Sequence, residues 1–165
     1  IQIEILKKIL VTNSGFSYSP KLSSLKLIIN NIRKNRNSKQ TLHSSIIFVK
    51  DNLINICREG IGTQRNNPIC LKVKSSNKIL WDERFVLETK KYDLTCELID
   101  AFKWNSIKKL FFDKKKRKLP MLILKTLPLI NNGNEKFIPF VNSKYYLKKN
   151  GINFYFSPRI PLTFN

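Results

Sequence analysis

The histidine and the cysteines are the residue types in this sequence best suited to nucleophilic catalysis or metal binding. His43 is the single histidine, and the three cysteines are Cys57, Cys70 and Cys96. One imidazole and three thiolates would suit a tetrahedral zinc site, although their spacing matches no common zinc motif. A cysteine–histidine nucleophile pair is the other arrangement open to them. Reduced cytosolic thiols and a strand histidine with a local hydrogen bond are the simpler interpretation, which we adopt.

Other catalytic patterns are missing from the sequence. It contains neither GxGxxG nor GxxxxGK[ST], and its five glycines make a glycine-rich phosphate loop improbable on composition. The paired carboxylates Asp82-Glu83 fall in a predicted turn, where acidic residues are common. We therefore predict no catalytic residue and no metal site within the chain.

Positive charge is the feature that points to a partner. Lys and Arg total 31 against 11 Asp and Glu, a formal net charge of +20, which favours association with polyanions. Two clusters carry the densest charge: Arg33, Lys34, Arg36 and Lys39, and then Lys114, Lys115, Lys116, Arg117 and Lys118. Lysine and arginine bind phosphates without reading sequence, so we predict these nine residues as the nucleic-acid contacts. A solvated loop is the alternative for the run 114–118.

Aromatic residues could add stacking contacts with nucleic acid, and an anionic membrane is a second possible partner for a basic protein. Six aromatic residues could either stack on unpaired bases or pack in the core: Trp81, Trp104, Tyr145, Tyr146, Tyr155 and Phe156. Peripheral membrane attachment would require a basic amphipathic helix, and residues 20–36 come closest. Their apolar face is better explained by core packing, so we expect no membrane partner.

The elements that position these residues fall into two parts. The first 40 residues are predicted to be helical. One helix ends near Asn13-Ser14-Gly15, and an amphipathic helix begins after Ser19-Pro20 and runs to about Ile32. From Thr41 the sequence becomes rich in β-branched and apolar residues, which predicts a hairpin of Thr41–Val49 and Leu53–Cys57.

Further hairpins and short helices are predicted towards the C-terminus. Lys78–Trp81 pairs with Phe85–Glu88, a short helix follows Pro120, and a third hairpin turns at Asn131–Asn134. Tyr145–Phe156 is expected to add one more strand. The predicted class is α+β, with residues 1–40 as a helical segment and residues 41–165 as a mainly antiparallel β domain.

Several short motifs, in order, resemble the C-terminal region of tRNA(Ile)-lysidine synthetases, especially the alphaproteobacterial form. Tyr18-Ser19-Pro20 resembles that family's Tyr-Pro-Pro-like start of a leucine-rich helix. Further similar motifs are Thr41-Leu42-His43-Ser44-Ser45 (family Thr-Leu-Gly-Gly-Cys), Arg58-Glu59, Trp81-Asp82-Glu83-Arg84-Phe85 (Trp-Asp-Gly-Arg-Phe), Lys125-Thr126-Leu127-Pro128 and Phe156-Ser157-Pro158-Arg159-Ile160-Pro161-Leu162. His43-Ser44-Ser45 and Glu83 depart from the family pattern.

The resemblance implies a ligase that uses ATP, with Mg²⁺, to join lysine to the wobble cytidine of tRNA(Ile) bearing a CAU anticodon, which changes its codon from AUG to AUA. The family's ATP loop, Ser-Gly-Gly-x-Asp-Ser, does not occur here. The expectation is therefore a cytoplasmic fragment that docks tRNA, with lysine and ATP bound by a catalytic domain upstream of Ile1. Arg58 and Arg84 either contact RNA or, in the case of Arg84 with Trp81-Asp82, lock a hairpin. A structural RNA-binding protein, such as a ribosomal protein, is the alternative.

Overall fold

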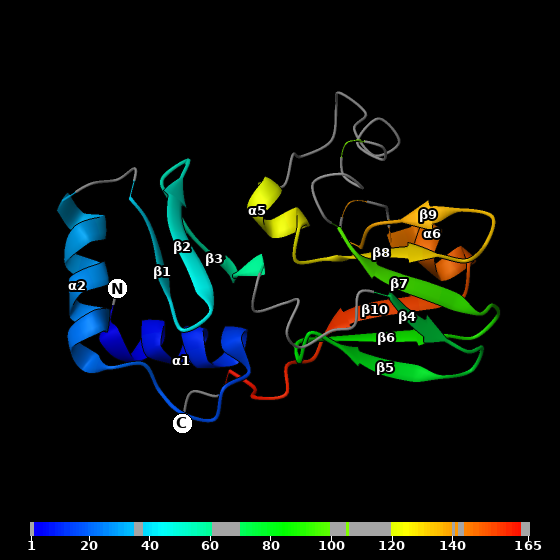
Figure 1. The fold of residues 1–165 in the computed structure, drawn as a ribbon, viewed down its shortest axis with the longest axis horizontal. Coiled ribbons are helices and arrows are strands. Elements are labelled where there is room, and N and C mark those ends of the chain that lie inside the picture. The colour runs from blue at the N-terminus through cyan, green and yellow to red at the C-terminus, as the bar shows by residue number, and fades with distance from the viewer. Residues whose placement is uncertain are drawn as a thin grey trace.

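The computed structural model describes residues 2–34, 38–60, 70–99, 105, 120–139, 141 and 144–162. The described helices are α1 (Ile3–Ser14), α2 (Leu22–Lys34), α5 (Met121–Leu124) and α6 (Lys144–Lys149). The described strands are β1 (Lys39–Leu42), β2 (Ser45–Lys50), β3 (Leu53–Arg58), β4 (Cys70–Val73), β5 (Lys78–Trp81), β6 (Phe85–Thr89), β7 (Leu94–Leu98), β8 (Pro128–Asn131), β9 (Lys136–Phe137) and β10 (Ile152–Phe156). They form three antiparallel sheets (Figure 1), so the predicted α+β class is confirmed.

The first part of the fold packs two helices on a three-stranded sheet. The sheet order is β1-β2-β3, and α1 and α2 lie beside it (Figure 1). α1 ends as predicted, because Gly15 takes a left-handed φ of 69° and its N–H bonds to the Val11 carbonyl. Apolar residues from both helices and β2 form one core: Leu6, Leu10, Leu25, Ile28, Ile29 and Ile47. The expected boundary at residue 40 therefore falls inside a single hydrophobic core.

The second part of the fold has two sheets around a larger core. One sheet has the order β10-β6-β5 and the other β4-β7-β8-β9. Buried residues from both sheets and α6 meet in one cluster, among them Trp81, Leu87, Cys96, Ile130, Phe137, Leu147 and Ile152. The predicted hairpins of β5 with β6 and of β8 with β9 are present.

α5 links the two parts of the fold. Leu122 and Ile123 pack against Ile46, Phe48 and Cys57 on the face of the first sheet opposite the helices. The first sheet is therefore covered on both faces.

Two sequence-based expectations are corrected by the structure. His43 lies in a two-residue turn between β1 and β2, where His43 and Ser44 have φ values of 55° and 53°. This turn splits the predicted strand Thr41–Val49. The sequence does not indicate it, because neither residue is the glycine or asparagine that usually marks such turns. The expected strand Tyr145–Phe156 begins instead with α6, and β10 starts at Ile152.

No helix in the described part of the chain is long and apolar enough to cross a membrane.

Candidate nucleic-acid interface

The outer face of α2 carries the best-defined cationic surface among the predicted contacts. The inner face of the helix is buried through Leu25, Ile28 and Ile29. Helical periodicity therefore turns Lys26, Asn30, Arg33 and Lys34 outward, and all four are exposed. We call these four residues the α2 face. Arg33 and Lys34 are predicted contacts, and the structure places Lys26 and Asn30 beside them; the sequence does not single out these two, because neither belongs to a dense run of charge.

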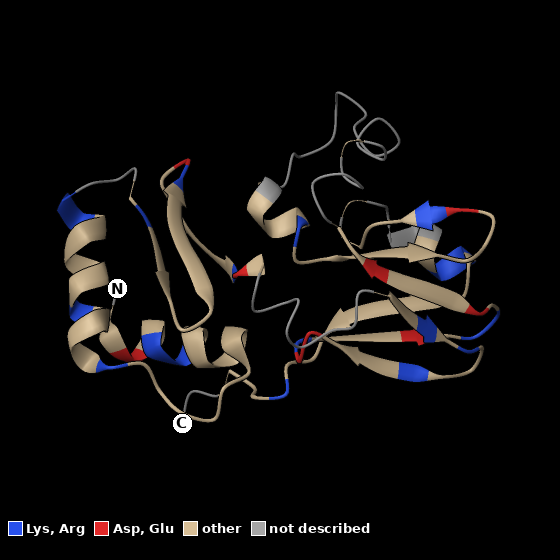
Figure 2. Ribbon diagram, viewed as in Figure 1, with Lys and Arg blue, Asp and Glu red and all other residues tan. Residues whose placement is uncertain are grey.

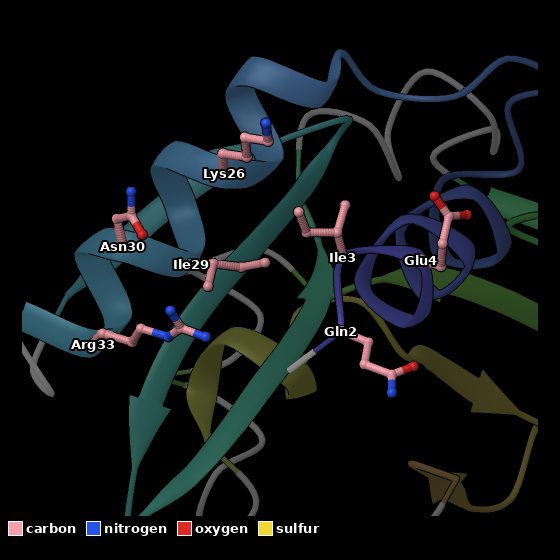
Figure 3. A pocket seen from close by; sticks show the side chains of 7 residues that line it. All are labelled: Gln2, Ile3, Glu4, Lys26, Ile29, Asn30 and Arg33. Carbon is pink, nitrogen blue, oxygen red and sulfur yellow. The ribbon is translucent and has the colours of Figure 1, made fainter.

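A shallow groove runs along the α2 face. Figure 3 shows Lys26, Asn30 and Arg33 in a row on α2, while Ile29 and Ile3 point into the space between α2 and α1. The groove has a volume of about 500 Å³, and Gln2 and Glu4 complete its lining. The Glu4 carboxylate lies 3.3 Å from the Lys7 ammonium, which offsets its charge. Lys26, Asn30 and Arg33 along the α2 side of the groove are residue types that contact phosphates.

Lys39 is separated from the α2 face by the pleat of β1. The Asn31 side chain donates a 2.8 Å hydrogen bond to Gln40, which holds the end of α2 against β1. Gln40 therefore faces the helices, and neighbouring Lys39 faces the other side of the sheet. The exposed Lys39 accordingly lies near the Cys57 thiol and lowers its pKa against the larger effect of burial. Arg33 and Lys34 are brought together, and Lys39 is not.

The remaining predicted cations lie outside the described residues. They are Arg36 and the whole run Lys114, Lys115, Lys116, Arg117 and Lys118. Their assignment as nucleic-acid contacts stays a prediction.

Arg58 and Arg84 are buried in a polar cluster and do not reach solvent. Their side chains are 1% and 5% exposed, and both face the fully buried carboxylate of Asp82. Arg84 binds that carboxylate through Nε at 2.9 Å and through Nη2, and Arg58 Nε lies 3.6 Å from Oδ1. Burial lowers the pKa of Arg58, against the opposing attraction of Asp82. The structure thus shows the hairpin-locking alternative, with the Trp81 ring also buried.

The same cluster joins the two parts of the fold through α1. Arg58 donates to the Asn13 carbonyl at 2.7 Å, and Arg84 donates to the Asn13 side-chain oxygen at 2.9 Å. The turn residue Glu83 packs against the end of α1, where a Cβ on Gly15 would lie 3.1 Å from the Glu83 Cβ. Asn13, Arg58, Asp82 and Arg84 are called the junction cluster below.

The thiols and the imidazole do not form a reactive or metal-binding group. Burial raises the pKa of Cys57 to about 11 and that of Cys96 to about 12, so both are protonated at neutral pH. Cys57 belongs to the first sheet, whereas Cys70 and Cys96 belong to the sheet of β4 and β7. In the described ranges no three His, Cys, Asp or Glu side chains gather as a metal site would require.

The aromatic candidates differ in exposure. Trp81 is a core residue, whereas Tyr155 and Phe156 on β10 are 42% and 53% exposed. The Phe156 ring contacts Phe85 at 5.5 Å between centroids, which holds it against the sheet. Trp104 and the side chains of Tyr145 and Tyr146 lie outside the described part of the structure.

Comparisons with known proteins add no assignment. No protein-family model, no curated protein and no solved structure matches this chain.

Proposed function

We propose that this chain is an RNA-binding module and, more specifically, the tRNA-docking part of a tRNA(Ile)-lysidine synthetase. Its role is to hold tRNA(Ile) with a CAU anticodon while a catalytic domain joins lysine to the wobble cytidine. The proposed compartment is the cytoplasm, where this tRNA and its ligase meet.

The general part of the proposal is supported by the net charge of +20 and by the α2 face. Lys26, Arg33 and Lys34 are exposed on one side of a rigid helix. Such cations release counterions from phosphates, which makes binding strong at low salt and independent of sequence.

The observation that carries the family assignment is the backbone at the three departures from the family's glycines. His43, Ser44 and Glu83 stand where the resembling motifs have glycine, and their φ values are 55°, 53° and 58°. Glycine is the residue that takes a positive φ without steric cost. The family glycines would therefore fit this backbone, which supports the motif alignment on physical grounds.

The position of the motifs in space supports the same assignment. Arg58, Asp82 and Arg84 come from two of the resembling motifs and meet in the junction cluster. The C-terminal motif joins them, because the Arg159 backbone N–H bonds to the Glu83 carbonyl at 2.7 Å and its side chain pairs with Glu83 at 3.2 Å. Motifs more than seventy residues apart thus form one structural unit.

In this proposal ATP and Mg²⁺ bind to the catalytic domain and not to the residues that the structure describes. The Ser-Gly-Gly-x-Asp-Ser loop is missing from the sequence. Where the structure is described, no group of three or more His, Cys, Asp or Glu side chains gathers as a metal site. No catalytic step is therefore assigned to residues of this chain.

A structural RNA-binding protein remains the alternative function. The same exposed cations support it, because phosphate contacts do not distinguish one RNA from another. The choice of RNA separates the two proposals.

Binding of the purified chain to tRNA(Ile) with a CAU anticodon tests the proposal. We expect affinity to fall steeply between 50 and 300 mM KCl, with roughly tenfold preference over a ribosomal RNA hairpin of equal length. Incubation with ATP, lysine and this tRNA should release no AMP, and AMP release would refute the absence of an active site. Preference for the ribosomal hairpin would favour the alternative function, and failure to bind either RNA would refute both.

A further inference from the structure

A second cationic surface lies at the end of the fold farthest from α2. Lysines from three segments gather there: Lys74 and Lys78 beside the β4–β5 turn, Lys90 and Lys91 after β6, and Lys148 and Lys149 at the end of α6. We call these six residues the lysine end. All six are exposed. In Figure 2 these elements form the right-hand end of the molecule, opposite α2.

Hydrogen bonds fix the first two of these segments together. The Ser76 N–H donates to the Thr89 carbonyl at 2.9 Å, and the Thr89 N–H donates to the Asn77 carbonyl at 3.2 Å. The Ser75 hydroxyl reaches the Lys90 carbonyl at 3.4 Å. The β4–β5 turn is therefore held against the segment that follows β6.

The end of α6 is attached to the same place. The Lys90 N–H donates to the Gly151 carbonyl at 2.9 Å, and the Lys91 ammonium lies 3.5 Å from the Lys149 carbonyl. Gly151 has a φ of 67°, and a Cβ there would lie 2.9 Å from the Lys91 Cγ. A glycine is thus required for this close approach. The lysines are presented on a fixed backbone, which lowers the entropic cost of binding.

The charge at the lysine end is only partly neutralised, because one carboxylate, Glu88, lies opposite Lys78 in the β5–β6 pairing. Glu88 and Asp93 are the acidic residues on these segments. Glu88 accepts a 3.1 Å hydrogen bond from Asn153, and Asp93 accepts one of 2.7 Å from the Ser75 N–H. Six lysines thus face two carboxylates that are both hydrogen-bonded. Among the described residues, the ion pairs of the chain lie elsewhere.

A nucleic-acid backbone is the partner that fits this surface. Lysines act as point charges on spaced phosphates, and the side chains of the neighbouring Ser76 and Asn77 are exposed and can donate further hydrogen bonds. Membrane attachment would require a bulky apolar face. Among the described residues of these segments, Tyr92, which is 45% exposed, is the one large hydrophobic side chain on the surface. One such side chain does not make a bulky apolar face.

We infer that the lysine end is a second phosphate-binding surface, and that one folded RNA contacts both it and the α2 face. This inference rests on the proposed RNA-binding function and specifies the RNA. The two surfaces lie at opposite ends of the long axis (Figure 2). An RNA that reaches both must be large and folded, as a tRNA is, whereas a short single strand occupies one surface at a time.

Charge removal at three positions tests this inference. The variant Lys74→Gln/Lys90→Gln/Lys148→Gln removes three exposed cations and leaves the backbone hydrogen bonds between the three segments in place. The matched control Lys21→Gln/Lys50→Gln/Lys125→Gln removes the same charge from residues outside the lysine end and the α2 face. A third variant, Lys26→Gln/Arg33→Gln, reports on the α2 face. Circular dichroism and thermal unfolding verify that each variant is folded.

Affinity for tRNA and for an eight-nucleotide single strand is measured from 50 to 300 mM KCl. We expect the lysine-end variant to bind tRNA roughly tenfold more weakly at low salt, with a salt slope lower by up to about three. The matched control should change tRNA affinity less than about threefold. Two molecules of the single strand should bind to each protein chain, one at each surface. The lysine-end variant and the α2 variant should each lose one of these two binding sites.

The possible outcomes separate this inference from the proposed function. A lysine-end variant that binds tRNA like the matched control would overturn the inference alone, provided that the α2 variant is impaired. Loss of binding to phosphatidylserine vesicles without loss of tRNA binding would assign the lysine end to a membrane instead. Absence of tRNA binding by the unmodified chain would overturn both proposals.

Discussion

Burial sets the chemistry of the individual ionisable residues in this protein. His43 is the single histidine, and the Phe16 and Tyr18 rings each lie 5.1 Å from its ring, measured between centroids. Desolvation lowers its pKa from the ordinary 6.5, the Tyr18 backbone hydrogen bond opposes this, and the nearby charge of Arg58 adds to the lowering. His43 is therefore a neutral, partly buried turn residue at pH 7.

A proton NMR titration can measure the pKa of His43 directly, because the chain contributes one histidine signal. We expect a pKa below 6.5. Since the unfolded chain then binds a proton more readily than the folded one, the free energy of unfolding should be constant above about pH 7.5 and should fall as pH drops through 6.5. In His43→Asn this fall between pH 7.5 and 5.5 should flatten. A measured pKa at or above 6.5 would contradict the structure.

Turns with positive φ shape the β elements. Three two-residue turns, His43-Ser44, Asp51-Asn52 and Asp82-Glu83, have both residues at φ between 52° and 60°. Such turns match the twist of a hairpin. Asp82-Glu83 is predicted as a turn by the sequence, and Asp51-Asn52 lies between the two strands of the predicted first hairpin; Asp and Asn favour such turns. The turn His43-Ser44 was not predicted, because it contains none of the Gly, Asn and Asp residues that mark two-residue hairpin turns.

Replacing Ser44 by glycine should stabilise the first hairpin. A left-handed conformation costs a non-glycine residue about 1–2 kcal/mol, and the greater freedom of glycine in the unfolded chain offsets about 0.4–1 kcal/mol of this. We expect Ser44→Gly to raise the free energy of unfolding by about 0.5–1 kcal/mol, measured by urea denaturation. Ser76→Ala, at a φ of 65°, serves as a control that keeps the strain and should not stabilise. Destabilisation by Ser44→Gly would exclude strain at this turn.

At the scale of the whole molecule, the junction cluster joins the two parts of the fold. The cluster brings together three segments of the chain: Asn13 from α1, Arg58 from β3, and Asp82 and Arg84 from the β5–β6 turn. Both arginine side chains are buried there. Two positive charges buried with one carboxylate depend on that carboxylate. The cluster also fixes the α2 face relative to the lysine end, which a single folded RNA would require.

The variant Asp82→Asn should destabilise the protein by about 3–5 kcal/mol, because it leaves two guanidinium groups buried without their counter-charge. Asparagine accommodates the left-handed φ of 53°, so the backbone itself is not strained further. Glu83→Gln is the matched control: its ion pair with the 69% exposed Arg159 should contribute less than about 1 kcal/mol. Urea denaturation measures both. Equal stabilities of the two variants would show that the junction cluster does not join the two parts.

The sequence by itself determined the α+β class, the end of α1 at Gly15, the hairpin of β5 and β6, and the dominance of positive charge. These features depend on neighbouring residues, whose periodicity, turn chemistry and charge are visible along the chain. Tertiary structure alone decided that Arg58 and Arg84 are buried while Lys26 is exposed, and that Lys39 faces away from Arg33. It also assembled the lysine end from segments with no dense run of charge. Packing between distant segments sets burial and surface neighbours, and local sequence does not encode either.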